Sequence, residues 1–229
     1  MDAERTVTVN SARETPRAPQ PSGKPKMRGW IHFGAFCVTL GIFGFLESAT
    51  TTTSEAVAVC IYVVGLAIMF GTSALLHLVN WGPVGRQRMR RADHSTIFLG
   101  IAGTYTAIGV VALQGTNLVA LLTIAWVGAI VGIVVRQFFI DAPKWANAIP
   151  YVIVGWSAML FVGPLIASLG VLGFLGILAG GIAYTVGAIF YGAKRPNPIP
   201  GVFGHHELFH ALTVVGAGLH MAVVWASLH

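Results

Sequence analysis

The chain has 229 residues, of which 55% are hydrophobic and only 10% are charged, and its mean hydropathy is +0.74. A soluble domain carries charge on roughly 25% of its residues, so this composition excludes a soluble globular protein. The net charge of +6 comes from Lys and Arg residues in the N-terminal stretch and in short connections, a distribution typical of membrane orientation and not of nucleic-acid binding. We therefore expect a helical protein that crosses a membrane several times.

The first 27 residues contain Pro, Arg, Ser and Thr without apolar periodicity. Such a stretch cannot bury enough apolar surface to offset its chain entropy, so residues 1–27 are expected to form a disordered basic tail on the cytoplasmic side. No apolar core followed by a small-residue cleavage site precedes Trp30, which argues against a signal peptide. Residues 28–229 are expected to form the transmembrane domain.

The apolar runs of that domain predict an all-α fold, a bundle of seven transmembrane helices. The expected spans cover residues 30–46, 55–79, 93–113, 118–138, 146–161, 167–191 and 205–228. The boundary between the fifth and sixth spans is the least defined, because Gly163, Pro164 and Gly170 interrupt one long apolar stretch.

The distribution of positive charge predicts the orientation. All 14 Lys and Arg residues lie before the first span, in the connections on that same side or, for Arg136, at that end of the fourth span, and the opposite connections contain none. By the positive-inside rule the N-terminus is cytoplasmic and the C-terminus is outside, as an odd number of spans requires. We expect a multi-pass membrane protein with this orientation.

Several polar side chains meet at the cytoplasmic end of this arrangement. His206 and His210 begin the last span and share one helix face, one turn apart. His77 closes the second span, Ser73 lies one turn deeper on the same face, and Asp93 opens the third span. Ionisable residues within a bilayer are functional candidates by default.

Three imidazoles with an open fourth position are the ligand set of a catalytic zinc, which lowers the pKa of bound water to about 7. We therefore predict a Zn²⁺ site at His77, His206 and His210. Asp93 would accept a hydrogen bond from that water or act as a base, and Ser73 would orient a ligand or a substrate carbonyl. The alternative for Asp93 is that it only favours a helix N-terminus through the helix dipole.

The other histidines are expected to stay outside the site. His220 lies ten residues beyond His210, about 15 Å along a helix axis, and is too distant to join. Three are expected at the membrane interface and one is terminal, namely His32, His94, His205 and His229.

The segment His206 to His210 also matches the H-E-x-x-H pattern, in which Glu207 would be the general base of a metalloprotease. Only 19 residues follow His210, whereas a soluble zincin needs a cleft and a later ligand. Glu207 is equally explained as an acidic residue near a helix N-terminus. An intramembrane metalloprotease, with Asp93 or His77 as third ligand, stays open as an alternative.

Four motifs together give the chain a family resemblance. They are RGWIH at 28–32, S-xxx-H at 73–77, RRADHSTIFLGIAGTYT at 90–106 and HELFH at 206–210. In this order they resemble the hemolysin III family, the bacterial branch of the progestin and adipoQ receptors, which include the adiponectin receptors. The resemblance extends from Arg28 to the C-terminus. One departure is Ala107, where the family usually has Pro, and it puts a kink in the third helix in doubt.

The resemblance implies a seven-helix fold with an orientation opposite to that of G-protein-coupled receptors. It also implies zinc held by His77, His206 and His210, with Asp93 near the zinc-bound water and Ser73 adjacent. Relatives are linked to lipid amide hydrolysis of a ceramidase kind and to membrane-lipid homeostasis.

The expected function is a zinc-dependent hydrolysis of lipid amide or ester bonds, with membrane lipids as partners and no role for nucleic acid. One alternative is a zinc-stabilised membrane sensor or receptor without turnover. Another is a haemolysin-like pore or transporter, but a conduction path needs polar residues across the whole membrane, and here they gather on the inner side.

Overall fold

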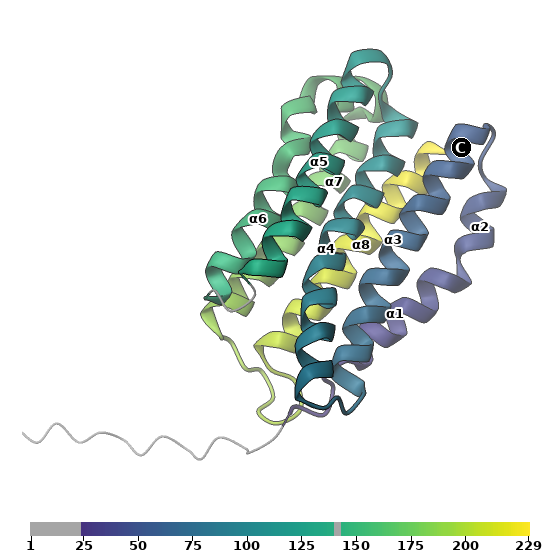
Figure 1. Cartoon of the computed structure of the whole chain (residues 1–229). Helices are drawn as coiled ribbons and strands as arrows, with labels where there is room; N and C mark the ends of the chain where they lie inside the picture. The colour runs from purple at the N-terminus through teal and green to yellow at the C-terminus, as the bar shows by residue number, and fades with distance from the viewer. Residues whose placement is uncertain (1–23, 140–142) are drawn as a thin grey trace, which may run out of the picture.

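The computed structural model describes residues 24–139 and 143–229, and these residues form a bundle of helices (Figure 1). Most of the expected tail, residues 1–23, lies outside the described residues. The elements in chain order are α1 (Trp30–Gly41), α2 (Phe43–Ser48), α3 (Thr53–Leu78), α4 (Pro83–Ala112), α5 (Gly115–Phe138), α6 (Lys144–Trp156), the 3₁₀ helix η1 (Ser157–Phe161), α7 (Val162–Ala193) and α8 (His205–Ser227).

Six helical segments of the described chain are long and apolar enough to cross a membrane, so the protein is a polytopic membrane protein. They are Trp30–Ser48, Thr53–Leu78, Pro83–Ala112, Gly115–Phe138, Ala148–Ala193 and His205–Ser227. The first combines α1 and α2, and the fifth, 46 residues long, contains most of α6 together with η1 and α7.

The 46-residue segment is divided by Gly170, whose φ of 68° and ψ of 175° are non-helical. A positive φ is open to glycine at little cost and strained for other residues, so glycine ends one helical stretch and permits another to begin. Figure 1 shows α6 and α7 side by side, so the chain reverses direction between them. The break falls at the third of the interrupting residues, inside the expected sixth span, which was therefore begun three residues too early.

The helix α4 begins at Pro83, well before the expected start at residue 93, so that boundary was wrong. Gly82 is its N-cap and Pro83 occupies the first helical position, where the missing N–H is tolerated. The intervening turns are rich in arginine, which is a good helix former but gives no apolar signal. The helix therefore carries charged turns at one end and apolar turns at the other.

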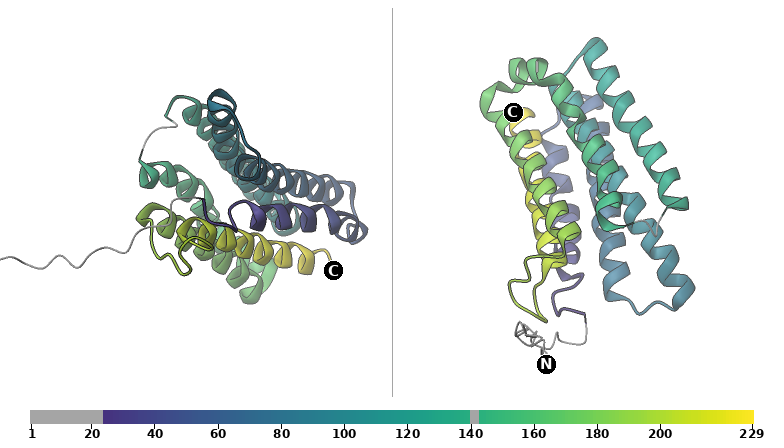
Figure 2. Two further views of the ribbon diagram at one scale, coloured as in Figure 1. Left: turned by 90° about the horizontal axis from the view of Figure 1, so that it is seen from below. Right: turned by 90° about the vertical axis from the view of Figure 1, so that its left-hand side faces the viewer.

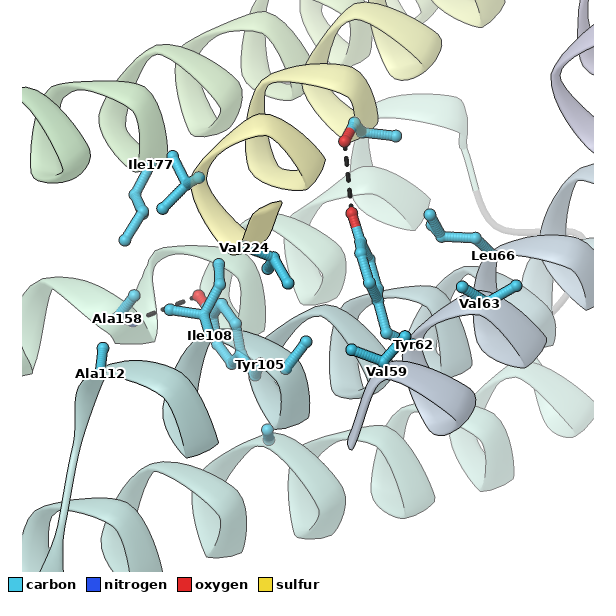
Figure 3. Packing of buried hydrophobic residues seen from close by; sticks show 14 of the residues in the cluster. Val59, Tyr62, Val63, Leu66, Tyr105, Ile108, Ala112, Ala158, Ile177 and Val224 are labelled. Carbon is cyan, nitrogen blue, oxygen red and sulfur yellow. Dashed lines mark hydrogen bonds between the residues drawn. The ribbon is translucent and has the colours of Figure 1, made fainter. Parts of the chain in front are cut away.

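Two buried tyrosines link helices across the core (Figure 3). The Tyr62 hydroxyl of α3 donates to the carbonyl oxygen of Ala217 in α8, at 3.3 Å. The Tyr105 hydroxyl of α4 donates to the carbonyl of Gly155 in α6 and accepts the Ala158 amide at 3.2 Å. Buried hydroxyl groups need such partners, and these bonds join helices that are distant in sequence.

The start of the first helix is tied to the connection between α7 and α8. The backbone amides of Lys26 and Met27 donate to the carbonyl oxygens of Gly201 and Val202, at 3.1 and 3.2 Å. Figure 2 shows α1 beside α8, and their N-terminal ends meet near this connection. This arrangement places the beginning of α1 against the first turns of α8, where the candidate site lies.

Candidate metal centre

Three histidines from two helices converge at one end of the bundle. His77 comes from the last turn of α3, and His206 and His210 come from the first two turns of α8. One ring nitrogen of each lies within 4.8 Å of those of the other two. His210 is buried and the other two are half-buried. The structure therefore brings together the three residues chosen from the sequence.

The spacing of these nitrogens fits a small tetrahedral ion. The Nε2 atoms of His77 and His206 are 3.2 Å apart. Two nitrogens each 2.0–2.1 Å from a tetrahedral zinc lie roughly 3.3 Å from one another. Imidazole nitrogens suit Zn²⁺, and three of them leave a coordination position for water or substrate. The donor set and the spacing of the His77 and His206 nitrogens thus fit the zinc that the resemblance implies.

Asp93 and Ser73 form a pair beside the histidines. Ser73 lies one turn before His77 on α3, and its hydroxyl interacts with the Asp93 carboxylate on α4. Both residues line the cavity that the histidines also line. Because α4 begins at Pro83, Asp93 lies in the third turn of its helix. The explanation of Asp93 by the dipole of a helix N-terminus was therefore wrong.

Glu207 has a structural role that differs from that of a protease base. Its side chain is fully buried and forms an ion pair with Arg28, just before α1. The same carboxylate accepts the Gly204 amide at 2.9 Å and so caps the N-terminus of α8. With both oxygens engaged away from the three histidines, Glu207 is the helix-end acidic residue of the second interpretation. The metalloprotease alternative therefore lacks the general base that it requires.

His32 was expected at the membrane interface, and this expectation was wrong. Its side chain is only 3% exposed and stacks on His210 with ring centroids 3.8 Å apart and planes 8° from parallel. Phe70 contacts its ring with a centroid distance of 5.0 Å. Neither ring nitrogen of His32 has a hydrogen-bond partner among the described residues. The ring therefore packs directly against a candidate ligand.

Two further histidines line the same cavity. His94 follows Asp93, and its Nδ1 lies 3.0 Å from Nη2 of Arg136, a residue of α5 that is only 2% exposed. His220 is buried near the opposite end of α8 with Nε2 3.0 Å from the carbonyl oxygen of Ile177, apart from the metal group as its sequence distance predicted. His205 contacts Asn197 outside the cavity. In the sequence, Arg136 counted only as one of the positive charges that indicate the membrane orientation of the chain.

A cavity of about 370 Å³ extends from this centre between the helices. Its walls are mainly apolar and include Leu66, Met69, Ile97, Ile101 and Val152. Three threonines in the lining donate to backbone carbonyl groups of their own helices, namely Thr104, Thr185 and Thr213. A mainly apolar chamber with a small number of polar groups is typical of a ligand-binding site.

Comparison with known proteins gives a family assignment. Residues 22–221 match the family model described as "Haemolysin-III related". The chain is 39% identical over 169 residues to Hemolysin-3 of Bacillus cereus, which covers 73% of this chain and 74% of that protein. It is 35% identical over 163 residues to a Hemolysin-3 homolog of Bacillus subtilis (strain 168), covering 71% and 73%.

A shorter similarity reaches outside the bacteria. Over 50 residues the chain is 46% identical to the ADIPOR-like receptor IZH2 of Saccharomyces cerevisiae, covering 20% of this chain and 16% of that protein. The family expected from the four motifs is thus confirmed. The chain is a member of the hemolysin III family, within the superfamily of progestin and adipoQ receptors.

Proposed function

We propose that this protein is a zinc-dependent hydrolase of lipid amide or ester bonds. The observation that carries the proposal is the convergence of three imidazoles with the Ser73–Asp93 pair at one end of an apolar cavity. Zn²⁺ held by His77, His206 and His210 would polarise a carbonyl group and acidify water. Proton transfer and positioning of the substrate would be carried out by the protein's own side chains.

Asp93 is positioned to move the proton. Asp93 lines the cavity, and the Ser73 hydroxyl beside it would orient its carboxylate. It would take the proton from the attacking water and return it to the leaving amine or alcohol, so that water and lipid amide yield a carboxylic acid and an amine. Ser73 would hold the carboxylate in the geometry that this transfer needs.

The cavity would position the substrate. The walls formed by Leu66, Met69, Ile97 and Ile101 would hold an acyl chain and exclude bulk water from the reacting carbonyl. The Arg28–Glu207 pair fixes the first turn of α8 against the start of α1, and so keeps His206 and His210 in register with His77. A bilayer lipid is the natural occupant of a chamber between membrane helices.

We also infer seven spans with a cytoplasmic N-terminus. Dividing the 46-residue segment at Gly170 gives seven passes of the chain, and the two ends of the described chain lie at opposite ends of the bundle (Figure 1). The Lys and Arg residues of the described chain lie at the helix ends and connections on the side of the metal centre, which by the positive-inside rule faces the cytoplasm. The site would then lie near the inner face of a bacterial cytoplasmic membrane.

The experiment compares wild type, Asp93→Asn and Ser73→Ala in neutral detergent, with fluorescent ceramide and a matched fluorescent lipid ester as substrates. Loss of general base catalysis typically lowers rates by about 10²–10⁴-fold, and we expect such a loss in Asp93→Asn with zinc content unchanged. Ser73→Ala should retain more activity, since it removes only the orienting bond. Wild type that binds zinc without hydrolysing either lipid would instead identify a zinc-stabilised sensor.

A further inference from the structure

A second group of polar side chains lines the cavity at the end remote from the metal centre. On α8 the lining residues are His206, Phe209, His210, Thr213 and His220. His220 follows His210 by ten residues, roughly 15 Å along the helix axis. Tyr184 of α7 also lines the cavity, with its ring centroid 5.6 Å from that of His220. Thr104 of α4 lines it at a similar depth, eleven residues beyond Asp93. We call His220, Tyr184 and Thr104 the distal group.

Glycines on α7 and α8 make room for the two rings of the distal group. A Cβ at Gly180 of α7 would lie 2.3 Å from Nε2 of His220, and one at Gly216 of α8 would lie 2.8 Å from the Tyr184 ring. On each helix the glycine precedes the ring by four residues, so each helix presents one glycine and one ring to the other. Close packing therefore holds both rings at the wall of the cavity.

The distal group has more free acceptors than donors. Nε2 of His220 lies 3.0 Å from the Ile177 carbonyl oxygen, which only accepts, so a neutral imidazole carries its hydrogen on Nε2. Nδ1 is then an acceptor, and it has no partner in the described part of the chain. The Thr104 hydroxyl donates to the Gly100 carbonyl oxygen at 2.7 Å, which leaves its lone pairs. The Tyr184 hydroxyl can either donate or accept.

Neighbouring donors in the cavity wall are used within the protein. Nε1 of Trp156 donates to the Thr185 hydroxyl at 2.9 Å, and that hydroxyl donates to the Gly181 carbonyl oxygen at 2.8 Å. The Tyr105 hydroxyl donates to the Gly155 carbonyl. The charged residues of the wall lie at the metal end, and they are Arg28, Arg86, Arg90 and Asp93. A ligand group that complements the distal group is therefore neutral and supplies a hydrogen.

We propose that the distal group binds a hydroxyl group carried on the acyl chain of the ligand, roughly 15 Å from the metal centre. The hydroxyl would donate to Nδ1 of His220 and accept from Tyr184. A buried acceptor without a partner costs free energy, so a ligand that fills it gains affinity. An ionisable side chain within a membrane that takes no part in the metal group is also a functional candidate. The inference rests on the proposed function only where it places the reacting carbonyl at the metal.

The test measures how fatty acids, the acid products of the proposed hydrolysis, displace a fluorescent fatty acid from the full-length chain in neutral detergent. The probes are stearic, 12-hydroxystearic, 12-oxostearic and 2-hydroxystearic acid. In an extended chain the 12-hydroxyl lies about as far from the carboxyl group as His220 lies from the metal centre. The 12-oxo group accepts but cannot donate, and the 2-hydroxyl remains beside the carboxyl group.

The variants separate the distal group from the rest of the cavity. His220→Phe removes the acceptor and keeps a ring, and Tyr184→Phe and Thr104→Val remove one hydroxyl each. Thr213→Val is the matched control, because Thr213 also lines the cavity and also donates to a carbonyl of its own helix, that of Phe209 at 2.9 Å. It lies only three residues beyond His210, near the metal end. Size-exclusion profiles and zinc content confirm that each variant is folded.

Wild type should bind 12-hydroxystearic acid about three- to tenfold more tightly than stearic acid, the size of one buried hydrogen bond. The oxo acid should gain less, because it cannot donate to Nδ1 of His220, and the 2-hydroxy acid should bind like stearic acid. His220→Phe should abolish the preference, and Tyr184→Phe and Thr104→Val should reduce it. Thr213→Val should retain it.

Equal binding of stearic and 12-hydroxystearic acid by wild type would overturn the proposal, since His220 would then only join α7 to α8. A preference that survives in His220→Phe would overturn it as well. If His220→Phe does not fold, a preference unchanged in both Tyr184→Phe and Thr104→Val has the same consequence. The proposed hydrolysis fails separately: wild type without zinc or turnover, but with a preference that depends on His220, refutes the hydrolase and leaves the distal site standing.

Discussion

The ion pair between Arg28 and Glu207 joins the start of α1 to the first turn of α8, and its two partners differ in burial. The Glu207 side chain is fully buried, whereas the Arg28 side chain is 19% exposed. Replacing Arg28 with Met leaves a carboxylate without its counter-ion in the interior. Replacing Glu207 with Gln leaves a guanidinium that water can still reach, and the amide oxygen can still accept from Gly204.

This difference in burial determines how much each substitution should destabilise the protein. Removing one partner of a buried pair destabilises a protein by about 3–5 kcal/mol, and we expect Arg28→Met to lower the free energy of unfolding by about 3 kcal/mol. Loss of a charge-assisted hydrogen bond with a solvated partner amounts to about 1.5 kcal/mol, which we expect for Glu207→Gln. The double variant leaves no buried charge and should lie within about 1.5 kcal/mol of wild type. The double variant should therefore be destabilised much less than the sum of the two single variants, which is the signature of two residues that stabilise each other in the folded protein.

The assay is unfolding of the purified protein in mixed micelles by titration with dodecyl sulfate, followed by circular dichroism and by zinc retention. Equal destabilisation by the two single variants would refute the argument from burial. Additive effects in the double variant would show that the two groups do not interact in the folded protein.

Three further results are expected. Gly170→Ala should destabilise the same unfolding transition by about 1–3 kcal/mol, because its φ of 68° and ψ of 175° are strained for any residue with a Cβ. Packing does not contribute, since no neighbouring atom of the described residues lies within 4 Å of the added Cβ. Gly181→Ala, equally open but helical, should not destabilise. Tyr62→Phe should lower the free energy of unfolding by about 1 kcal/mol through loss of its bond to the Ala217 carbonyl, and an unchanged value would contradict that role. His32→Ala should weaken zinc affinity by about tenfold in a competition titration, while His32→Phe, which keeps a ring against His210, should stay near wild type; equal losses would refute the stacking argument.

The metal group could be chosen from sequence because its signals are local. His206 and His210 share a helix face by spacing, and His77 is brought to the same depth by alternation of the spans. Each of these steps needs only helix geometry and the distribution of positive charge. The close approach of the three rings, by contrast, depends on how α3 packs against α8, which the sequence pattern does not contain.

The misplaced features have a common physical cause. The start of α4 was set at Asp93 because the apolar stretch begins there, yet the helix already begins at Pro83 and its first turns are rich in arginine. His32 was placed at the interface because it lies near a span end, although tertiary contact with His210 buries it. Glu207 could serve as a base or as a cap until the position of Arg28 was known. Each decision depended on a neighbour distant in sequence.

The central claim is that His77, His206 and His210 hold one zinc ion beside Asp93. The most direct measurement is the metal content of the purified chain by elemental mass spectrometry, for wild type, for alanine variants of the three histidines and for Asp93→Ala. The account predicts about one zinc per chain, lost in each histidine variant and retained in Asp93→Ala. No zinc in wild type, or zinc unaffected by all three histidine changes, would contradict it.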